Sequence, residues 1–379
     1  MTVGLSDRAP TKVCVTGATG FVGAHVVQAL CARGDEVKVT YRNPKRLSAI
    51  GDLRVRRVRA DVFDQRALRR AFKGADVVFH TAGYVGSYPT DLAWRVNAEG
   101  PLAAVEAAAA AGCRRVVVTS TISAVGLASD GVPAHEGTGY PKDRMGLTYP
   151  DSKHEGERVA LDAAERHGIE VVVVNPAYVL GVPVDRSRPN QTSTRTVGNY
   201  LRGRLPGVIG APMNFVDVED VAAGHLLAAD RGTPGERYIL GGRNMTWPAL
   251  IDRLAQLSGV HHPVVVLPRQ IVALSQLRER LGLPGALPAQ GYALMAQEWR
   301  FSSTKARREL GYRSRPLDHT LQATIEWYRE LIERRVFDQA GRSPLSTAAA
   351  GTQLLGRLGV LEPLKLGQRI AGCRVIAGI

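Results

Sequence analysis

The stretch YPDSKHEGE, from Tyr149 to Glu157, places a phenol and an ammonium group four positions apart. Residues four apart on a helix share a face, so Lys153 would lie beside Tyr149. A neighbouring ammonium stabilises phenolate and lowers the pKa of the tyrosine toward working pH, which suits a group that donates or accepts a proton. The same pair also fits an ordinary charged helix start, so the residues upstream must decide between the two interpretations.

Upstream, the segment TGATGFVG stands between a strand-like run, KVCVT, and a helical pattern that ends at Gly34. In this setting Gly17 permits a tight turn, Gly20 lets the backbone approach a pyrophosphate, and Gly23 lets the helix pack on the sheet. The helix N-terminus adds amide donors and partial positive charge. The turn therefore predicts a dinucleotide-binding site, which also includes Ala18, Thr19, Phe21 and Val22.

The rest of the first half alternates short apolar runs with helical patterns. Several runs are apolar on both faces, as buried parallel strands are. The strand-like segments are 12–16, 36–41, 55–61, 76–80, 114–120 and 170–176, and the helical ones are 64–72, 94–112 and 150–168. This order predicts an α/β fold with a Rossmann-type doubly wound parallel sheet and a smaller, discontinuous α/β substrate domain toward the C-terminus.

The alternation weakens after residue 176, where prolines become frequent and helical patterns follow at 215–230, 246–259 and 318–335. We expect four parts: a flexible N-terminus (1–10), an NAD(P)-binding Rossmann domain (11–180, rejoined in part by 215–245), a mainly substrate-binding region (181–335), and a C-terminal tail (336–379).

The second strand-like run ends in TYRNPKR. Enzymes that prefer NAD tend to carry an acid here for the ribose hydroxyls, whereas an arginine suits the 2′-phosphate of NADP. Arg42, with Tyr41 before it and Lys45 behind, therefore predicts NADP, with NAD left open. The alternative is a solvated basic loop.

Within one family, the phrases RNPKR, NPAYVLG, PGERYILGG and FSSTKARRELGY most resemble the dihydroflavonol 4-reductase-like group. That family is the extended short-chain dehydrogenase/reductases, also called the NAD-dependent epimerase/dehydratase family, which the ordered motifs of this chain resemble as a set. The resemblance spans roughly residues 11–335. It rests on these motifs: TGATGFVG, Asp61-Val62, FHTAG, VNAEG, VVVTSTISAVG, the Tyr149–Lys153 pair, NPAYVLG, FVDVEDVA and FSSTKARRELGY.

The resemblance implies a role for each matching residue. Tyr149 would be the proton donor or acceptor, Lys153 would lower its pKa and bind the nicotinamide ribose, and Thr121 would hold the substrate oxygen. Asn97 would help to hold a proton-relay water. The remaining cofactor contacts implied by the family pattern are Asp61, Val62, Thr81, Ala82, Gly83, Pro176 and Val179.

The two residues after Thr121 narrow the choice of reaction. Sugar 4,6-dehydratases of this family place an Asp-Glu pair there, whereas this chain has Ile122-Ser123. We therefore predict an NADPH-dependent reductase of a ketone or aldehyde, acting on a small-molecule carbonyl or alcohol substrate. A nucleotide-sugar or hopanoid-associated sugar epimerase is the alternative, although Arg42 argues against it. A non-catalytic NAD(P)-binding accessory protein ranks third.

The composition of the chain limits the kinds of partner that we expect it to bind. The formal net charge is +14 and the pI about 10.0, which favours acidic partners. Arginine-rich composition explains this charge without a nucleic acid, because the basic residues occur along the whole chain and no nucleic-acid motif accompanies them. Four scattered cysteines and an N-terminus without an apolar signal region predict a reduced, cytoplasmic protein without a metal site. Members of the family that the chain resembles commonly form dimers, so the resemblance implies a homodimer.

The tail lies outside the resemblance. Leu354, Leu355, Leu358 and Leu361 fall on one helical face among basic residues, before Pro363. Such a segment suits weak contact with an anionic membrane surface, packing on the enzyme or a second subunit, or disorder.

Overall fold

The structure is a computed structural model that describes residues 10–129, 131–189, 193–205, 207–282, 289–337 and 374–376. The predicted tail residues Leu354 to Leu361, and with them the membrane interpretation of the tail, lie outside the described residues, as does Cys373. The three described cysteines, Cys14, Cys31 and Cys113, are free thiols.

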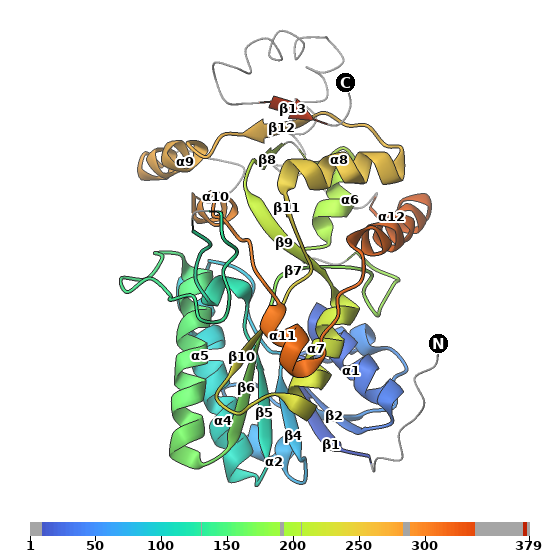
Figure 1. Cartoon of the computed structure of the whole chain (residues 1–379). Coiled ribbons are helices and arrows are strands. Elements are labelled where there is room, and N and C mark those ends of the chain that lie inside the picture. The colour runs from blue at the N-terminus through green and yellow to red at the C-terminus, as the bar shows by residue number, and fades with distance from the viewer. Residues whose placement is uncertain are drawn as a thin grey trace.

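A seven-stranded sheet forms the centre of the lower lobe in Figure 1. All of its neighbouring strands pair in parallel, in the order β10-β6-β5-β4-β1-β2-β3. The strands are β1 Lys12–Thr16, β2 Glu36–Tyr41, β3 Arg56–Arg59, β4 Val77–His80, β5 Arg115–Thr119, β6 Glu170–Pro176 and β10 Arg237–Leu240. The predicted Rossmann-type α/β fold is confirmed.

Helices cover both faces of this sheet (Figure 1). On one face, α1 (Phe21–Arg33) packs against α7 (Val218–Arg231); on the other, α4 (Gly100–Ala110) lies between α2 (Gln65–Phe72) and α5 (Thr148–His167). Alternate strand residues supply the two cores, with Val13 and Val15 facing one way and Cys14 the other. Because strand side chains alternate, one apolar run is buried on both sides of the sheet.

A smaller second lobe stands above the carboxyl ends of the strands (Figure 1). It contains two three-stranded sheets, ordered β11-β9-β7 and β13-β12-β8. Its strands are β7 Tyr178–Leu180, β8 Gly207–Ile209, β9 Pro212–Asp217, β11 Arg243–Thr246, β12 Val264–Leu267 and β13 Arg374–Ile376. Its helices are α6 Arg195–Leu201, α8 Trp247–Ser258, α9 Ile271–Arg280, α10 Ala289–Met295 and α12 Leu317–Glu333, and α11 Thr304–Leu310 packs back on α7 and β10.

Two predicted helices differ from the structure. The segment predicted as one helix over 94–112 begins earlier, at α3 (Thr90–Trp94), and passes through a π-helical turn, Arg95–Glu99, before α4. The segment predicted as helix from 215 is still strand β9 up to Asp217, because Phe215 and Val216 are buried between β7 and β11.

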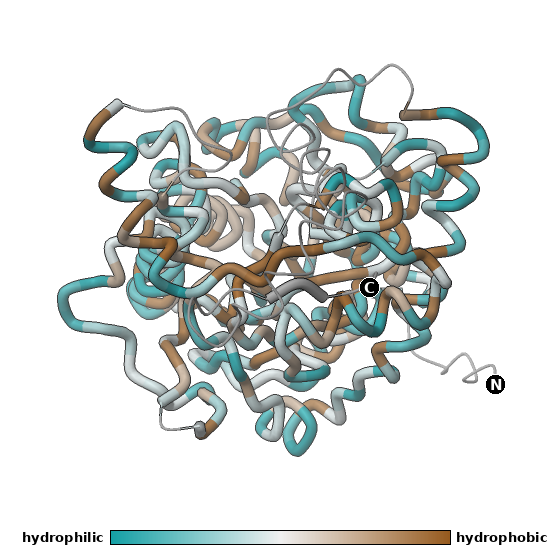
Figure 2. The backbone as a smooth tube through the Cα atoms, turned by 90° about the horizontal axis from the view of Figure 1, so that it is seen from above, coloured by the Kyte–Doolittle hydropathy of each residue, from teal (hydrophilic) through white to brown (hydrophobic). Residues whose placement is uncertain are grey.

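Hydropathy follows this architecture. Seen from above, brown apolar segments run through the middle of the molecule, while teal polar segments form much of its outline (Figure 2). Among the described residues, no helix has the length and apolar character needed to cross a bilayer.

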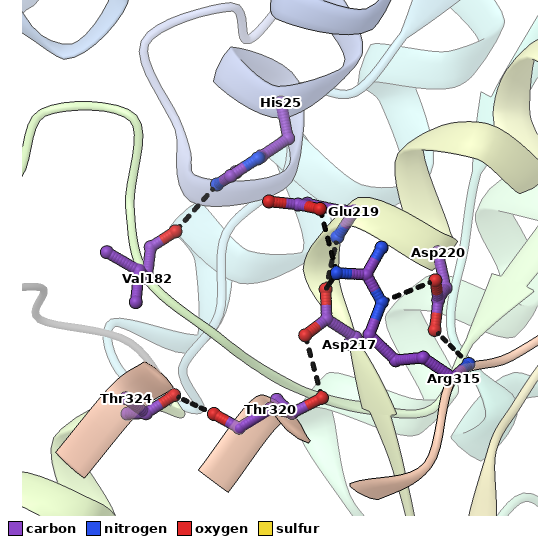
Figure 3. Close-up of polar contacts among 8 residues, drawn as sticks. All are labelled: His25, Val182, Asp217, Glu219, Asp220, Arg315, Thr320 and Thr324. Atoms are coloured by element: carbon purple, nitrogen blue, oxygen red, sulfur yellow. Dashed lines mark hydrogen bonds and ion pairs between the residues drawn. The ribbon is translucent and has the colours of Figure 1, made fainter. Parts of the chain in front are cut away.

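A polar cluster joins the two lobes at the start of α7 (Figure 3). Asp217 caps α7 by accepting from Glu219 N at 2.7 Å, and it accepts from Thr320 Oγ1 of α12, also at 2.7 Å. Arg315 donates through Nε to Asp220 at 2.9 Å and through Nη1 to Glu219 at 2.8 Å. Asp217 and Asp220 are both buried, so one guanidinium offsets two buried carboxylates.

The change Arg315→Ala should lower the free energy of unfolding by about 1–3 kcal/mol, because it leaves Asp217 and Asp220 buried without their cation. The loss is smaller than for a fully buried pair, since Arg315 is partly exposed. Urea denaturation at pH 7 measures it. Arg308→Ala is the matched control, because the exposed Arg308–Glu309 pair should contribute about 0.5 kcal/mol or less. Equal losses in both variants would contradict the prediction.

Candidate active site

The glycine turn between β1 and α1 has the close approaches that its sequence predicts. Gly17 has φ +70°, and a Cβ there would stand 2.5 Å from the amide nitrogen of Ala82. A Cβ on Gly23 would stand 2.5 Å from Thr81 Oγ1. Gly20 occupies the N-cap of α1, where no described side chain caps the helix. The first amides of α1 are therefore left for an anion, which suits a pyrophosphate.

The end of β2 brings two of the predicted cofactor residues together. Arg42 Nη1 lies 4.0 Å from Asp61 Oδ2, and both side chains remain accessible. Asn43 accepts from Lys45 N at 3.0 Å, which starts a short 3-10 helix (Pro44–Ile50) and leaves the Lys45 side chain exposed. An exposed arginine beside an acid at this edge would meet the adenosine ribose of a dinucleotide.

The residues at the end of β4 lie between the glycine turn and α5. Thr81 Oγ1 donates to Thr16 O at 2.6 Å. Gly83 lies against Lys153, since a Cβ on Gly83 would stand 2.9 Å from Lys153 Nζ. His80 is fully buried with Nδ1 2.9 Å from Thr16 Oγ1, and burial lowers its pKa to about 3. A neutral imidazole held at a strand end indicates a structural role for His80.

Tyr149 and Thr121 meet through their hydroxyl groups. Tyr149, in the first turn of α5, makes a side-chain hydrogen bond with Thr121, which directly follows β5 and its neighbour Ser120. Ser123 adds its backbone N–H and its hydroxyl, each 3.3 Å from Thr121 Oγ1. The pairing puts two hydroxyl groups at one point above the carboxyl end of the sheet, where ligands bind in open α/β sheets.

The pKa of Tyr149 does not follow the sequence-based expectation. Burial is the largest effect and raises the pKa above its usual value, while the hydrogen bond with Thr121 lowers it. The expected lowering by Lys153 is not found in this geometry, where the cost of desolvating a phenolate decides the direction of the shift.

Lys153 is itself a buried cation. Its Nζ donates to Thr119 O at 3.0 Å. Burial lowers its pKa from 10.5 to about 8, and the charge of Glu157, one helical turn further on, raises it in opposition. At neutral pH the ammonium form therefore prevails, in a site where little water screens it.

Asn97 is fully buried in the π-helical turn. Its Oδ1 accepts from Tyr84 N at 2.9 Å, and its Nδ2 donates to Tyr84 O at 3.0 Å and to Ser152 Oγ at 3.1 Å. These bonds tie the loop after β4 to α5, and Gly156 lets α5 approach the backbone oxygen of Asn97 closely. The structure thus gives Asn97 a positioning role; the water-holding role stays a prediction.

The sequence-based search missed Glu157, although it ends the quoted YPDSKHEGE segment. Glu157 is buried, accepts from Asn175 Nδ2 at 2.6 Å and pairs with Arg237 at 3.1 Å. Asn175 also donates to Thr121 O at 2.9 Å. The sequence did contain an indication of this role, because Glu157 lies one helical turn after Lys153. The residues that bind Glu157, however, come from the distant strands β6 and β10.

Two further placements complete the site. Gln290 of α10 accepts from Thr148 N at 3.2 Å, which brings the second lobe to the start of α5; nothing in the sequence marked this residue. Pro176 ends β6 and Val179 lies buried in β7, so both follow the strand beside β5. Their cofactor contacts stay predictions.

The residues present fit a nicotinamide dinucleotide. The evidence is the cradle that a Cβ on Gly17 or Gly23 would fill, together with the uncapped start of α1. This cradle, the accessible Arg42–Asp61 pair and the Tyr149–Lys153 helix lie along the carboxyl edge of one parallel sheet. A fold and site of this kind define a dinucleotide-dependent enzyme of the extended short-chain dehydrogenase/reductase type.

The comparisons with known proteins agree. Residues 13–241, more than half of the chain, match the sequence model described as the NAD dependent epimerase/dehydratase family. The chain therefore belongs to the NAD-dependent epimerase/dehydratase family.

Named relatives include reductases. A Synechocystis sp. protein, provisionally named a dihydroflavonol 4-reductase, is 32% identical over 326 residues, covering 83% of this chain and 94% of that protein. Sterol demethylase protein B of Methylococcus capsulatus is 34% identical over 325 residues, covering 83% and 98%. The crystal structure of a nucleoside-diphosphate-sugar epimerase from Pseudomonas aeruginosa has a TM-score of 0.71 at 27% identity, covering 85% and 98%.

The change Lys153→Met should stabilise the fold at pH 7 by on the order of 1–3 kcal/mol, because it removes a cation whose burial lowers its pKa. The unfolded chain binds this proton more tightly than the native state between about pH 8 and 10.5, so the wild type gains stability as pH rises through that window. The advantage of the variant should therefore shrink toward pH 10.

Urea denaturation of both proteins at pH 7 and pH 10 checks this. A variant that is less stable than the wild type at pH 7, or a difference that does not change with pH, would contradict the prediction.

Proposed function

We propose that the protein is an NADPH-dependent reductase that converts a small-molecule ketone or aldehyde to an alcohol. The observation that carries the proposal is the hydrogen bond between Tyr149 and Thr121, with Lys153 buried one helical turn away. Two neighbouring hydroxyl groups can both donate hydrogen bonds to the same carbonyl oxygen. One of them can then transfer its proton to that oxygen.

The chain's own residues have these roles. Thr121 donates a hydrogen bond to the substrate oxygen and fixes its position. Tyr149 transfers its hydroxyl proton to that oxygen as it gains negative charge, or accepts the proton in the reverse reaction. When bound, the nicotinamide group supplies or accepts the hydride.

Lys153 acts on the phenolate that Tyr149 leaves behind. The phenolate is costly in a buried site, and an ammonium group nearby offsets part of that cost. Glu157 favours the charged form of Lys153. The glycine cradle would hold the pyrophosphate, and Arg42 and Lys45 would hold the 2′-phosphate beside Asp61 and Val62.

The residues at two positions of the chain favour reduction over the other reactions of the family. Ile122 and Ser123 begin the short 3-10 helix that follows Thr121, where an acid pair would serve dehydration. Arg42 stands at the end of β2, where an epimerase that keeps NAD bound would carry an acid. The reductase name of the Synechocystis relative supports the same choice.

The change Tyr149→Phe should lower kcat by about 10²–10⁴-fold, because the proton donor is lost while the ring remains. The dissociation constant for NADPH should change by less than about two-fold, since the hydroxyl faces the substrate. NADPH oxidation against a panel of ketones and aldehydes measures the first effect, and fluorescence titration the second.

Tyr238→Phe is the matched control, because this buried tyrosine lies in β10 and bonds Thr233 N instead of the site. A Tyr149→Phe variant that keeps wild-type turnover would refute the assigned proton donor. Intact NADPH binding with no turnover by the wild type on any carbonyl would count against the reductase.

The change Arg42→Ala should raise KM for NADPH about 10–100-fold, as expected for the loss of a charge-assisted contact with phosphate. KM for NADH should change by less than about three-fold. Steady-state kinetics with both cofactors measure the ratio. Arg56→Ala is the control, because Arg56 is exposed on the neighbouring strand β3. Equal effects on both cofactors would contradict the 2′-phosphate assignment.

A further inference from the structure

Helix α9 exposes a row of leucines. Leu274 and Leu277 lie in α9 and Leu281 is its C-cap residue; the three are spaced by three and four residues and are 61%, 53% and 63% exposed. Residues at these spacings share one face of a helix. The opposite side contains Ser275, which is buried. A soluble protein seldom exposes several large apolar residues together without a partner for them.

This leucine face is tied to the active site through α10. Glu279, at the end of α9, accepts from Ala289 N at 2.7 Å, where α10 begins. Gln290 of α10 accepts from Thr148 N, next to Tyr149. In Figure 1, α9 and α10 lie one above the other over the top of α5. The leucines therefore stand on the part of the second lobe that borders the catalytic helix.

Three of the four other large apolar residues exposed in the described part of the chain lie in loops that lead to α5 or are bonded to it. Val85, 80% exposed, and Tyr88, 52% exposed, belong to the loop after β4, which Asn97 ties to α5. Val132, 64% exposed, belongs to the loop that connects β5 to α5. Six of the seven large apolar residues exposed in the described part of the chain thus lie on segments around Tyr149, and only Ile332 does not.

These segments also carry basic residues. From Arg269 to Leu281 the chain has three arginines and one glutamate. Arg269 pairs with Glu298 at 2.9 Å, Arg278 Nη2 lies 3.8 Å from Glu279 Oε1, and Glu279 also accepts from Ala289 N at the start of α10. Lys142 and Arg144 are exposed in the loop before α5, on either side of the exposed Asp143. Leucines flanked by arginines on a helix suit the boundary between lipid headgroups and acyl chains, where the apolar side chains enter the lipid and the cations meet anionic headgroups. The net charge of +14 adds long-range attraction.

We propose that the leucine face of α9, with the apolar loop residues Val85, Tyr88 and Val132, docks on the surface of an anionic lipid bilayer. Docking in this orientation turns the segments around Tyr149 toward the lipid, so that an apolar substrate dissolved in the bilayer reaches the site without crossing water. Binding does not depend on the reaction proposed above, because it needs neither cofactor nor substrate.

The experiment is vesicle co-sedimentation of the full chain. Phosphatidylcholine vesicles are compared with vesicles that also contain phosphatidylglycerol, at low and at high salt. The wild type should bind the anionic vesicles, and high salt should weaken the binding. Replacing Leu274, Leu277 and Leu281 together by serine should lower the partition coefficient roughly ten-fold or more. Ile332→Ser is the matched control and should bind as the wild type does.

The triple variant is used only if its circular dichroism and NADPH binding match the wild type; if they do not, Leu277→Ser alone replaces it. Absence of wild-type binding, or equal binding by wild type and variant, overturns the proposal. So does loss of binding in a Leu354→Ser/Leu358→Ser variant with α9 intact, which would assign the contact to the tail. A switch from dimer to monomer in the α9 variant, seen by sedimentation velocity, would assign the leucine face to a second copy of this chain and also overturn it.

Discussion

The buried ammonium of Lys153 is the constraint on which the site depends. A cation without water needs oxygen partners and a compensating charge, and here these are the carbonyl oxygen of Thr119 and the carboxylate of Glu157. Glu157 in turn needs Asn175 of β6 and Arg237 of β10. The strand order β10-β6-β5 is therefore what allows a lysine on α5 to remain charged inside the protein.

The sequence predicted those parts of the site that local rules define. The glycine turn, the parallel strands and the Tyr149–Lys153 spacing each follow from a few neighbouring residues, and the structure has them. It did not predict the rise in the pKa of Tyr149, because spacing indicates which charges are near but not how much solvent is lost. Asn97 was found, yet the π-helical turn around it was not, since a continuous α-helix fits the same residues.

Prediction failed most often in the second lobe, for a related reason. Strands such as β7 and β8 have three residues each, too few for an alternation of polar and apolar side chains to be recognised. Gln290 and Arg315 act through partners far away in the chain. Pairings of this kind are fixed by the folded structure and leave no local pattern.

The Arg315 cluster has a consequence for the order in which the protein is made. A ribosome releases the strands up to β6 early, and these can associate as the chain emerges. Asp217 and Asp220 also emerge before their guanidinium partner, and Thr320 of α12 follows later still. Until Arg315 and α12 are translated, burying the start of α7 would leave two carboxylates without compensation. The nascent chain should therefore complete the packing of α7 only after Arg315 and α12 of the second lobe have been translated.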